Sequence, residues 1–292
     1  MPAITRGTVL LAAAGAAVLG MLVPRHGAAV APPAVAAEAV PARSAPFPGL
    51  RKELRRLARR APARAAAIFV QDTRTGKVAA LNPDRPFIAA SLIKLPVMAA
   101  VYARWERSPR TRTESRRAWT AAMITLSDNA CTDRMIDFLG GPEVVTRYCR
   151  RRGWDGLRLR HAILNHGGRR GINTCTAREV TALLTALDRR ELVSPAADAE
   201  MWSLLRRQTM VQRIPAGLPQ RPGLEVGNKT GTLRSVLHDA AIVHAGDTRY
   251  ALCILLSRPR SEEAGDRFCR EVSATVFRAL CPVEEPRAVA QR

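Results

Sequence analysis

Residues 87–94 read FIAASLIK, in which two bulky apolar residues and two alanines lead into a Ser-x-x-Lys motif. After this stretch, apolar residues recur at helical spacing as far as Val101. A hydroxyl and an amine that are three residues apart at the start of a helix lie on the same face. The helix N-terminus also favours an incoming negative charge. The stretch therefore predicts a helix whose first turn presents Ser91 and Lys94 together.

Two further short motifs follow this one along the chain. The sequence SDN occupies residues 127–129, between two predicted helices, and KTGT occupies residues 229–232, on a predicted strand. Each motif is common by itself, and an N-cap serine with a solvated lysine would explain Ser-x-x-Lys alone. The three motifs rarely occur together by chance in this order, with Ser-x-x-Lys at the start of a helix, SDN between two helices and KTGT on a strand. Together they indicate that Ser91 is a nucleophile.

The wider pattern predicts an α+β fold in which helices separate two groups of strands. A basic amphipathic helix at residues 51–60 and a β-hairpin at 65–81 come first, and strands and a last helix close the chain. The interior helices are predicted at 116–126, 129–139, 142–152, 176–187 and 198–210, the later strands at 225–233, 240–244 and 250–257, and the last helix at 262–280. This order predicts an antiparallel sheet built from both chain ends and flanked by helices, plus an all-helical lobe.

On these motifs the chain resembles the class A β-lactamase family, within the penicillin-binding serine enzymes, as a divergent member. The likeness extends to the Asp72–Gly76 turn, to Gly140-Gly141-Pro142 and to Leu164-Asn165. It covers a catalytic domain at residues 50–283, and it implies a β-lactamase/transpeptidase-like fold that needs neither a cofactor nor a metal. The six cysteines likewise match no CxxC zinc or redox spacing.

The resemblance implies a role for each catalytic residue. Ser91 would attack an activated amide carbonyl, and Lys94 could take its proton if burial and a neighbouring Lys229 depress the pKa of Lys94. Ser127 would relay a proton to the departing nitrogen. The backbone N–H groups of Ser91 and Thr232 would form the oxyanion hole.

The resemblance also implies how the substrate is held. Asn129 would hold the acylamino side chain, while Lys229 with the two threonines of KTGT would bind the substrate carboxylate. The implied substrate-binding residues are Asn129, Asn165, Thr230, Gly231 and Thr232.

The sequence departs from the family at two places. His161 occupies the position of the omega-loop glutamate that activates the deacylating water. A neutral imidazole can act as a general base near pH 7, so His161 is a candidate deacylation base, and a histidine that packs away from the water is the competing interpretation. Ser91 and Ser127 are 36 positions apart (127 − 91), which is fewer than usual in the family and implies a more open cleft.

Charge and the N-terminus bear on partners and location. The net charge of +21 is spread along the chain and aromatic residues make up only 4%, so we expect a solvated basic surface and no nucleic-acid partner. Residues 1–36 resemble an export signal, with an N-terminal anchor as the alternative, and lead into a linker at 37–49. We therefore expect a protein that is secreted or otherwise extracytoplasmic, in the cell envelope, with no membrane span after cleavage of the signal. We also expect a monomer, and residues 284–292 form a C-terminal tail.

Three functions stay open at this stage. The first is a β-lactamase-like hydrolase, and the second is a penicillin-binding or D,D-peptidase-like enzyme that deacylates slowly on β-lactams or peptidoglycan-stem-like substrates. The third is a non-catalytic module that binds the cell envelope. For an exported chain, one or more disulfides among the six cysteines is the ordinary expectation, and buried free thiols are the alternative.

Overall fold

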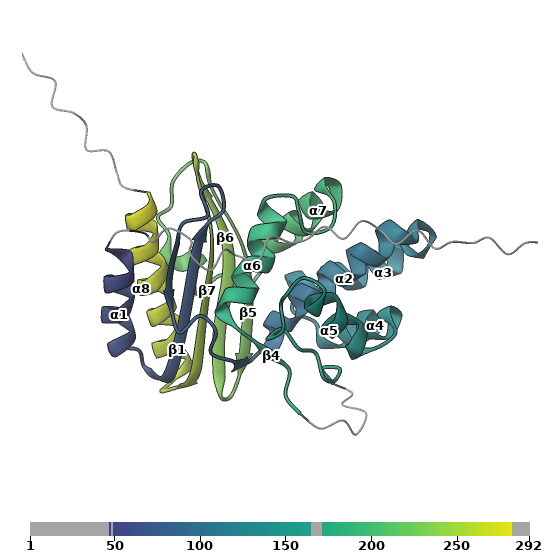
Figure 1. Cartoon of the computed structure of the whole chain (residues 1–292), viewed down its shortest axis with the longest axis horizontal. Coiled ribbons are helices and arrows are strands. Elements are labelled where there is room, and N and C mark those ends of the chain that lie inside the picture. The colour runs from purple at the N-terminus through teal and green to yellow at the C-terminus, as the bar shows by residue number, and fades with distance from the viewer. Residues whose placement is uncertain (1–46, 48, 165–170, 282–292) are drawn as a thin grey trace, which may run out of the picture. The chain divides into compact units, whose positions relative to one another are not determined.

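A five-stranded antiparallel sheet joins the two ends of the chain (Figure 1). The computed structural model describes residue 47, residues 49–164 and residues 171–281, all within one compact unit of residues 36–292. The strand order is β2-β1-β7-β6-β5. The strands are β1 (Ala63–Asp72), β2 (Val78–Leu81), β5 (Leu224–Leu233), β6 (Val236–Ala245) and β7 (Thr248–Pro259). Because β1 pairs along its length with β7, the prediction of a sheet built from both chain ends is confirmed.

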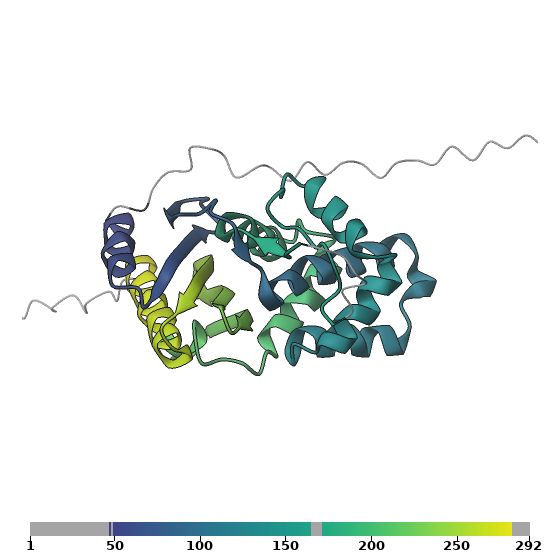
Figure 2. The same ribbon diagram turned by 90° about the horizontal axis from the view of Figure 1, so that it is seen from below.

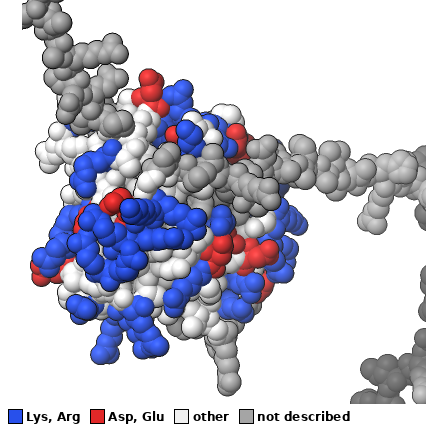
Figure 3. All heavy atoms as spheres, turned by 60° about the vertical axis from the view of Figure 1, so that its left-hand side comes forward, with Lys and Arg blue, Asp and Glu red and all other residues white. Residues whose placement is uncertain are grey.

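Two helices cover one face of this sheet. They are α1 (Leu50–Arg59) and α8 (Glu262–Leu280), and both views place them together on the same side (Figures 1 and 2). Leu50, Leu54 and Leu57 of α1 are buried and belong to the same apolar cluster as Leu252 and Ile254 of β7. The basic side chains of α1 point outward, and Lys and Arg dominate this side of the surface (Figure 3). The predicted amphipathic helix is therefore a packed surface helix.

The opposite face of the sheet carries α6 and the all-helical lobe. The lobe is built around α2 (Lys94–Arg107), which is buried from Lys94 to Tyr102 and therefore lacks a polar face. The surrounding helices are α3 (Glu114–Thr125), α4 (Asn129–Leu139), α5 (Pro142–Arg150), α6 (Ala177–Asp188) and α7 (Pro195–Arg206). The connections add β3 (Phe87–Ile88), β4 (Thr174–Cys175) and the 3₁₀ turns η1 (Ala90–Ile93), η2 (Pro109–Thr111) and η3 (Pro215–Gly217).

One helix begins earlier than the sequence pattern predicts. Helix α7 starts at Pro195 and ends at Arg206, whereas the apolar spacing predicts residues 198–210. The reason is the N-cap, because the Ser194 hydroxyl accepts the Ala197 N–H at 3.2 Å and proline suits the first helical position. Asp198, the residue predicted to begin the helix, is instead buried inside its first turn.

The expectation of disulfides is wrong for this fold. All six cysteines are free, five of them buried and Cys131 half-buried. They are distributed over both sides of the sheet, since Cys253 belongs to the core below the helical lobe and Cys269 to the core below α1 and α8. Burial raises the pKa of Cys149 to about 12, which favours the protonated thiol. The cysteines therefore pack as small apolar residues.

The predicted export segment and tail lie outside the described residues, as does the linker up to residue 46. Among the helices that the structure describes, none is both long and apolar enough to cross a bilayer.

A tight contact between β5 and α7 generates a stability prediction. A Cβ atom on Gly227 would lie 2.5 Å from Trp202 Cζ3 and 3.0 Å from Leu205 Cβ. We expect Gly227→Ala to lower the free energy of unfolding by about 1–3 kcal/mol through overpacking, as measured by urea denaturation. The double variant Gly227→Ala/Trp202→Leu should recover part of this loss relative to Trp202→Leu alone. Additive losses in that cycle would show that the contact does not restrict Gly227.

Candidate active site

Ser91 lies in η1, a single 3₁₀ turn that leads directly into α2. The preceding residue, Ala90, has a φ of 45°, a left-handed conformation that a residue with a Cβ atom rarely adopts. Leu92 and Ile93 are fully buried and anchor the turn, whereas Ser91 itself is only half-buried. Such backbone strain persists only where the surroundings fix it, and it clusters at functional sites.

Strand β5 passes close to this turn at Gly231. A Cβ atom at that position would lie 3.3 Å from the Ala89 carbonyl oxygen, from Ala90 Cβ and from Leu92 Cγ. A larger residue would push β5 away from Ser91. The glycine of the KTGT motif therefore sets how closely the strand approaches the serine.

Lys94 begins α2 and is fully buried. Its Nζ donates to the backbone carbonyl of Ser127, to Ser127 Oγ at 3.1 Å and to Asn129 Oδ1 at 2.7 Å. Burial lowers the pKa of Lys94 to about 8, against the opposing effect of the carboxylates of Asp128 and Asp133. A fraction of Lys94 is therefore the free amine near neutral pH.

Lys229 reaches the same hydroxyl from the sheet side. Its Nζ donates to Ser127 Oγ at 3.0 Å and to the Thr230 carbonyl at 2.9 Å. Burial, followed by the positive charge of Lys94, lowers the pKa of Lys229 to about 7. Because Ser127 Oγ accepts from both amines, its own hydrogen is available to a third group. Ser127 also has a positive φ, of 57°.

A cavity of about 310 Å³ opens beside Ser91. Asn129 and Thr232, both exposed, line it together with Ser91 and His161. Ser91, Asn129, His161 and Thr232 of the predicted site thus share this cavity, and hydrogen bonds link Lys94, Ser127 and Lys229. The hydroxyl of the buried Thr230 instead lies 3.4 Å from Met210 Sδ, and Asn165 lies outside the described residues. The complete lining among the described residues is Ile88, Ala90, Ser91, Asn129, His161, Ile163, Gly171, Ile172, Asn173, Thr232 and Leu233.

The His161 imidazole is oriented by its neighbours. Its Nδ1 lies 2.8 Å from the Ala162 carbonyl oxygen. A carbonyl oxygen can only accept, so Nδ1 is the donor, and the lone pair of the neutral ring is on Nε2. The backbone carbonyl of His161 accepts from Asn173 Nδ2 at 3.1 Å, and the Asp133 carboxylate accepts the N–H of Ile163 at 2.6 Å.

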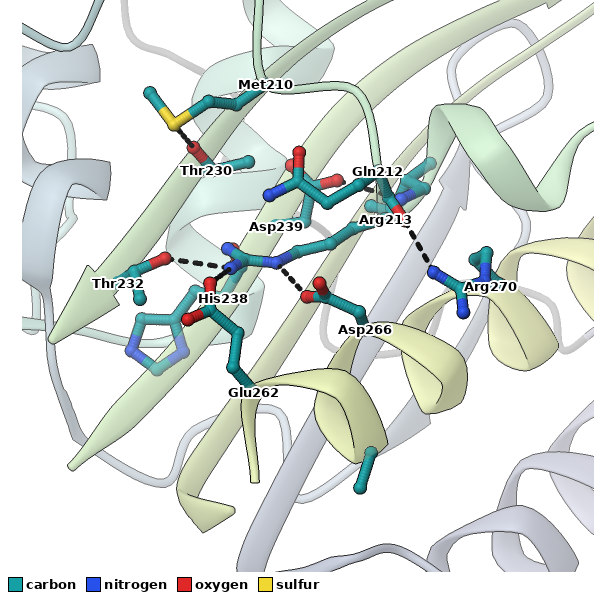
Figure 4. Close-up of polar contacts among 12 residues, drawn as sticks. Met210, Gln212, Arg213, Thr230, Thr232, His238, Asp239, Glu262, Asp266 and Arg270 are labelled. Atoms are coloured by element: carbon teal, nitrogen blue, oxygen red, sulfur yellow. Dashed lines mark hydrogen bonds and ion pairs between the residues drawn. The ribbon is translucent and has the colours of Figure 1, made fainter. Parts of the chain in front are cut away.

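The sequence analysis missed Arg213, which is buried behind the KTGT strand (Figure 4). Its Nη2 donates to Thr232 Oγ1 at 2.9 Å, Nη1 donates to the His238 carbonyl at 2.9 Å, and Nε donates to Asp266 Oδ1 at 2.6 Å. Glu262 adds a second carboxylate, 3.3 Å from Nη2. The guanidinium thus fixes the Thr232 hydroxyl, while the carboxylates of Asp266 and Glu262 offset its charge. No local motif marks this arginine in so arginine-rich a sequence.

Two residues of β6, His238 and Asp239, are buried polar groups that lie beside the KTGT strand. The fully buried Asp239 accepts from Asn228 Nδ2 and from the Ile214 N–H, both at 2.9 Å, and burial raises its pKa to about 7. His238 Nε2 donates to the Ile88 carbonyl at 2.8 Å, and its Nδ1 accepts the Leu256 N–H at 3.2 Å. Burial lowers the pKa of His238 to about 4, so its ring is neutral and links β6 to the segment just before Ser91.

The chain is similar in sequence to known β-lactamases. The family model described as "Beta-lactamase enzyme family" matches residues 49–118 and 108–280. A β-lactamase of Streptomyces fradiae is 36% identical over 163 residues, which are 46% of this chain and 52% of that protein, about half the length of each. A β-lactamase of Streptomyces lavendulae is 29% identical over 260 residues, which are 78% of this chain and 80% of that protein.

Solved structures agree with these matches. An ancestral class A β-lactamase superposes with a TM-score of 0.68 at 25% identity, over 79% of this chain and 99% of that one. The structure of PBP-A superposes with a TM-score of 0.72 at 23% identity, over 81% of this chain and 97% of that one, which shows a shared fold. The chain belongs to the β-lactamase enzyme family, as a divergent member of its class A branch.

Proposed function

We propose that this protein is an exported serine hydrolase that opens β-lactam amides through an acyl-enzyme at Ser91. The observation that carries the proposal is the convergence of two buried lysine amines on the Ser127 hydroxyl. In the cavity beside it, Ser91 is half-buried and open to a substrate. Export rests on the sequence of residues 1–36, in which an uncharged run precedes the small-residue site Ala34-Val35-Ala36.

Acylation begins with proton removal from Ser91. The free-amine form of Lys94 takes the hydroxyl proton while Ser91 Oγ bonds to the carbonyl carbon. The carbon–nitrogen bond of the lactam then breaks. Ser127 gives its proton to the departing nitrogen and regains one from Lys94, whose Nζ is 3.1 Å away. In net terms one proton passes from Ser91 to the nitrogen, and both Lys94 and Ser127 return to their starting protonation states.

Charge stabilisation in this step comes from the approach of β5 to the serine turn. The N–H groups of Ser91 and Thr232 would face the developing oxyanion, and the close approach at Gly231 supports this arrangement. The substrate carboxylate would meet Lys229, Thr230 and the Thr232 hydroxyl. That hydroxyl accepts from the buried Arg213, which holds its orientation.

Deacylation needs a base for the attacking water, and His161 is the candidate for it. It lines the cavity with Ser91, and the lone pair of its neutral ring is on Nε2. The water would lose its proton to Nε2 as its oxygen attacks the ester carbon. When the bond from that carbon to Ser91 Oγ breaks, the proton would return from His161 to Ser91 Oγ, which regenerates the neutral imidazole.

A second candidate function is a penicillin-binding or D,D-peptidase-like enzyme that releases the acyl group slowly. One observation favours it: none of the described residues that line the cavity carries a carboxylate. The carboxylate of Asp133 is close by, but it accepts the backbone N–H groups of Ile163 and Leu164. A non-catalytic module that binds the envelope through its arginines is the third candidate, and it predicts that Ser91 is never acylated.

Acylation is tested by replacing the nucleophile. We expect Ser91→Ala to reduce the rate of labelling by a fluorescent penicillin on the order of 10³-fold or more, because the hydroxyl that forms the proposed ester is removed. The control is Ser203→Ala, which removes an exposed hydroxyl on α7. In-gel fluorescence measures both variants. Undiminished labelling of Ser91→Ala would contradict the proposal, and an unlabelled wild-type protein would favour the non-catalytic candidate.

Deacylation is tested by intact-mass spectrometry after a pulse of benzylpenicillin. We expect the wild-type protein to return to its unmodified mass. In His161→Ala the adduct should persist, with deacylation slowed by roughly 10²–10⁴-fold and acylation little changed. The neighbouring Arg160→Ala, which removes an exposed side chain outside the cavity, is the control. A long-lived adduct on the wild-type protein would identify the slow-deacylation candidate instead.

A further inference from the structure

Helix α1 concentrates positive charge on the face that it turns away from the protein core. Residues 51–60 carry six cationic side chains and one carboxylate, so that their net charge is +5 (6 − 1), out of +21 for the whole chain. Every exposed residue between 50 and 60 is cationic, and we call this set the basic face of α1: Arg51, Lys52, Arg55, Arg56, Arg59 and Arg60. Lys and Arg spread over this side of the molecular surface (Figure 3).

This charge opposes the stability of the helix that carries it. Arg51 and Lys52 lie in the first turn, where the positive end of the helix dipole disfavours a cation. Arg51, Arg55 and Arg59 follow one another at intervals of four residues, and like charges at that spacing repel each other. The helix is held by its three buried leucines, which pack into the core. An anionic partner would relieve both unfavourable effects.

The chemistry of the basic face suits phosphate groups. Five of its six cations are arginines, whose guanidinium groups can bond two phosphate oxygens at once. Arg56 pairs with Glu53 at 2.8 Å and Arg60 with Glu271 at 3.1 Å, so that two of the six charges are partly neutralised within the protein. Because the apolar face of α1 is buried in the core, the helix cannot insert into a bilayer. The basic face therefore fits an anionic surface by charge alone.

The place of α1 in the chain favours a membrane as that surface. The uncharged run at residues 7–24, within the predicted export segment, ends 25 residues before Leu50 (49 − 24). A fully extended chain of this length spans at most about 90 Å. While the run engages a bilayer during export, α1 therefore stays within that distance of the lipid headgroups, which raises its effective concentration there.

We propose that the basic face of α1 docks the protein on a bilayer of anionic phospholipids, with the headgroup phosphates against its arginines. The contact is peripheral and electrostatic, because the leucines of α1 stay in the core. Helix α1 and the helical lobe lie on opposite faces of the sheet (Figures 1 and 2). Ser91 lies on the lobe side, at the start of α2, so docking leaves its cavity open to substrate. This inference does not depend on acylation of Ser91.

Cosedimentation of the full chain with lipid vesicles tests the proposal. One set of vesicles is phosphatidylcholine, and the other is an equal mixture of phosphatidylcholine and phosphatidylglycerol. The apolar run at residues 7–24 contributes to binding in both sets, so the quantity measured is the ratio of the two partition constants. We expect the mixed vesicles to bind on the order of tenfold or more tightly at low ionic strength. The ratio should fall toward equality in about 1 M salt, where the Debye length is about 3 Å. Equal binding to both sets at low salt would overturn the proposal.

Charge-matched variants locate the contact. The α1 variant replaces the four cations outside the two ion pairs: Arg51→Gln, Lys52→Gln, Arg55→Gln and Arg59→Gln. The control replaces four exposed arginines of the helical lobe: Arg104→Gln, Arg107→Gln, Arg147→Gln and Arg151→Gln. We expect the α1 variant to bring the ratio to within about twofold of equality and the control to keep it within about threefold of wild type. A thermal melt checks the fold of both variants. An equal loss in the two would show that net charge alone binds the vesicles, which contradicts a role for α1.

Two further measurements separate this proposal from its alternatives. The variant Ser91→Ala should bind the mixed vesicles as the wild type does, so a failure of acylation and a failure of docking are distinguishable. A soluble poly(glycerol phosphate) offers the same phosphate chemistry without a bilayer. At equal phosphate concentration we expect it to bind the protein more weakly than the mixed vesicles do. Tighter binding to the polymer would assign the basic face to a polyanion of the cell wall and overturn the membrane proposal.

Discussion

The hydroxyl of Ser127 accepts from two buried lysine amines, and the rest of the site depends on this arrangement. Lys94 comes from the central helix of the lobe and Lys229 from the edge strand of the sheet, so the interaction forms only when the two halves of the fold pack together. Burying two amines side by side is unfavourable while both are charged. The fold tolerates the pair because each amine has hydrogen-bond acceptors and because burial favours the neutral form. A lysine that is neutral near pH 7 can serve as a base, which an arginine cannot.

The surrounding structure supports this pair through backbone constraint and buried polar contacts. Ala90 and Ser127 both adopt left-handed backbone conformations, so the two serines are held by strained turns rather than by regular helix. Behind the KTGT strand, Arg213 fixes the Thr232 hydroxyl. The neutral His238 donates to the Ile88 carbonyl and so links β6 to β3, the short strand before the Ser91 turn. The site is thus preorganised on its catalytic side. On the other side, His161 is the candidate base for release of the acyl group, because none of the described residues that line the cavity carries a carboxylate.

Much of this could be predicted from the sequence, because the catalytic residues come in contiguous motifs. Ser91 and Lys94 lie three residues apart at the start of one helix, and KTGT lies on one strand. Their spacing in the sequence therefore determines which of these side chains lie close together. The boundaries of α4 and α8 were predictable for the same reason, since caps and apolar periodicity are local signals. Arg213 could not be found, because its partners Thr232 and Asp266 are 19 and 53 residues away and no short pattern links them. The free cysteines were mispredicted because thiol pairing depends on distances across the core, which composition does not give.

The lysine pair can be measured directly, because the chain has only four lysines. In a protein labelled with ¹³C at lysine Cε, an NMR pH titration should give four signals, of which the exposed Lys52 and Lys77 serve as internal references. The account predicts that the other two signals, assigned through Lys94→Arg and Lys229→Arg variants, titrate near pH 8 and pH 7. If both instead titrate near the ordinary lysine pKa of about 10.4, neither amine is a free base at neutral pH, and the proposed activation of Ser91 is contradicted.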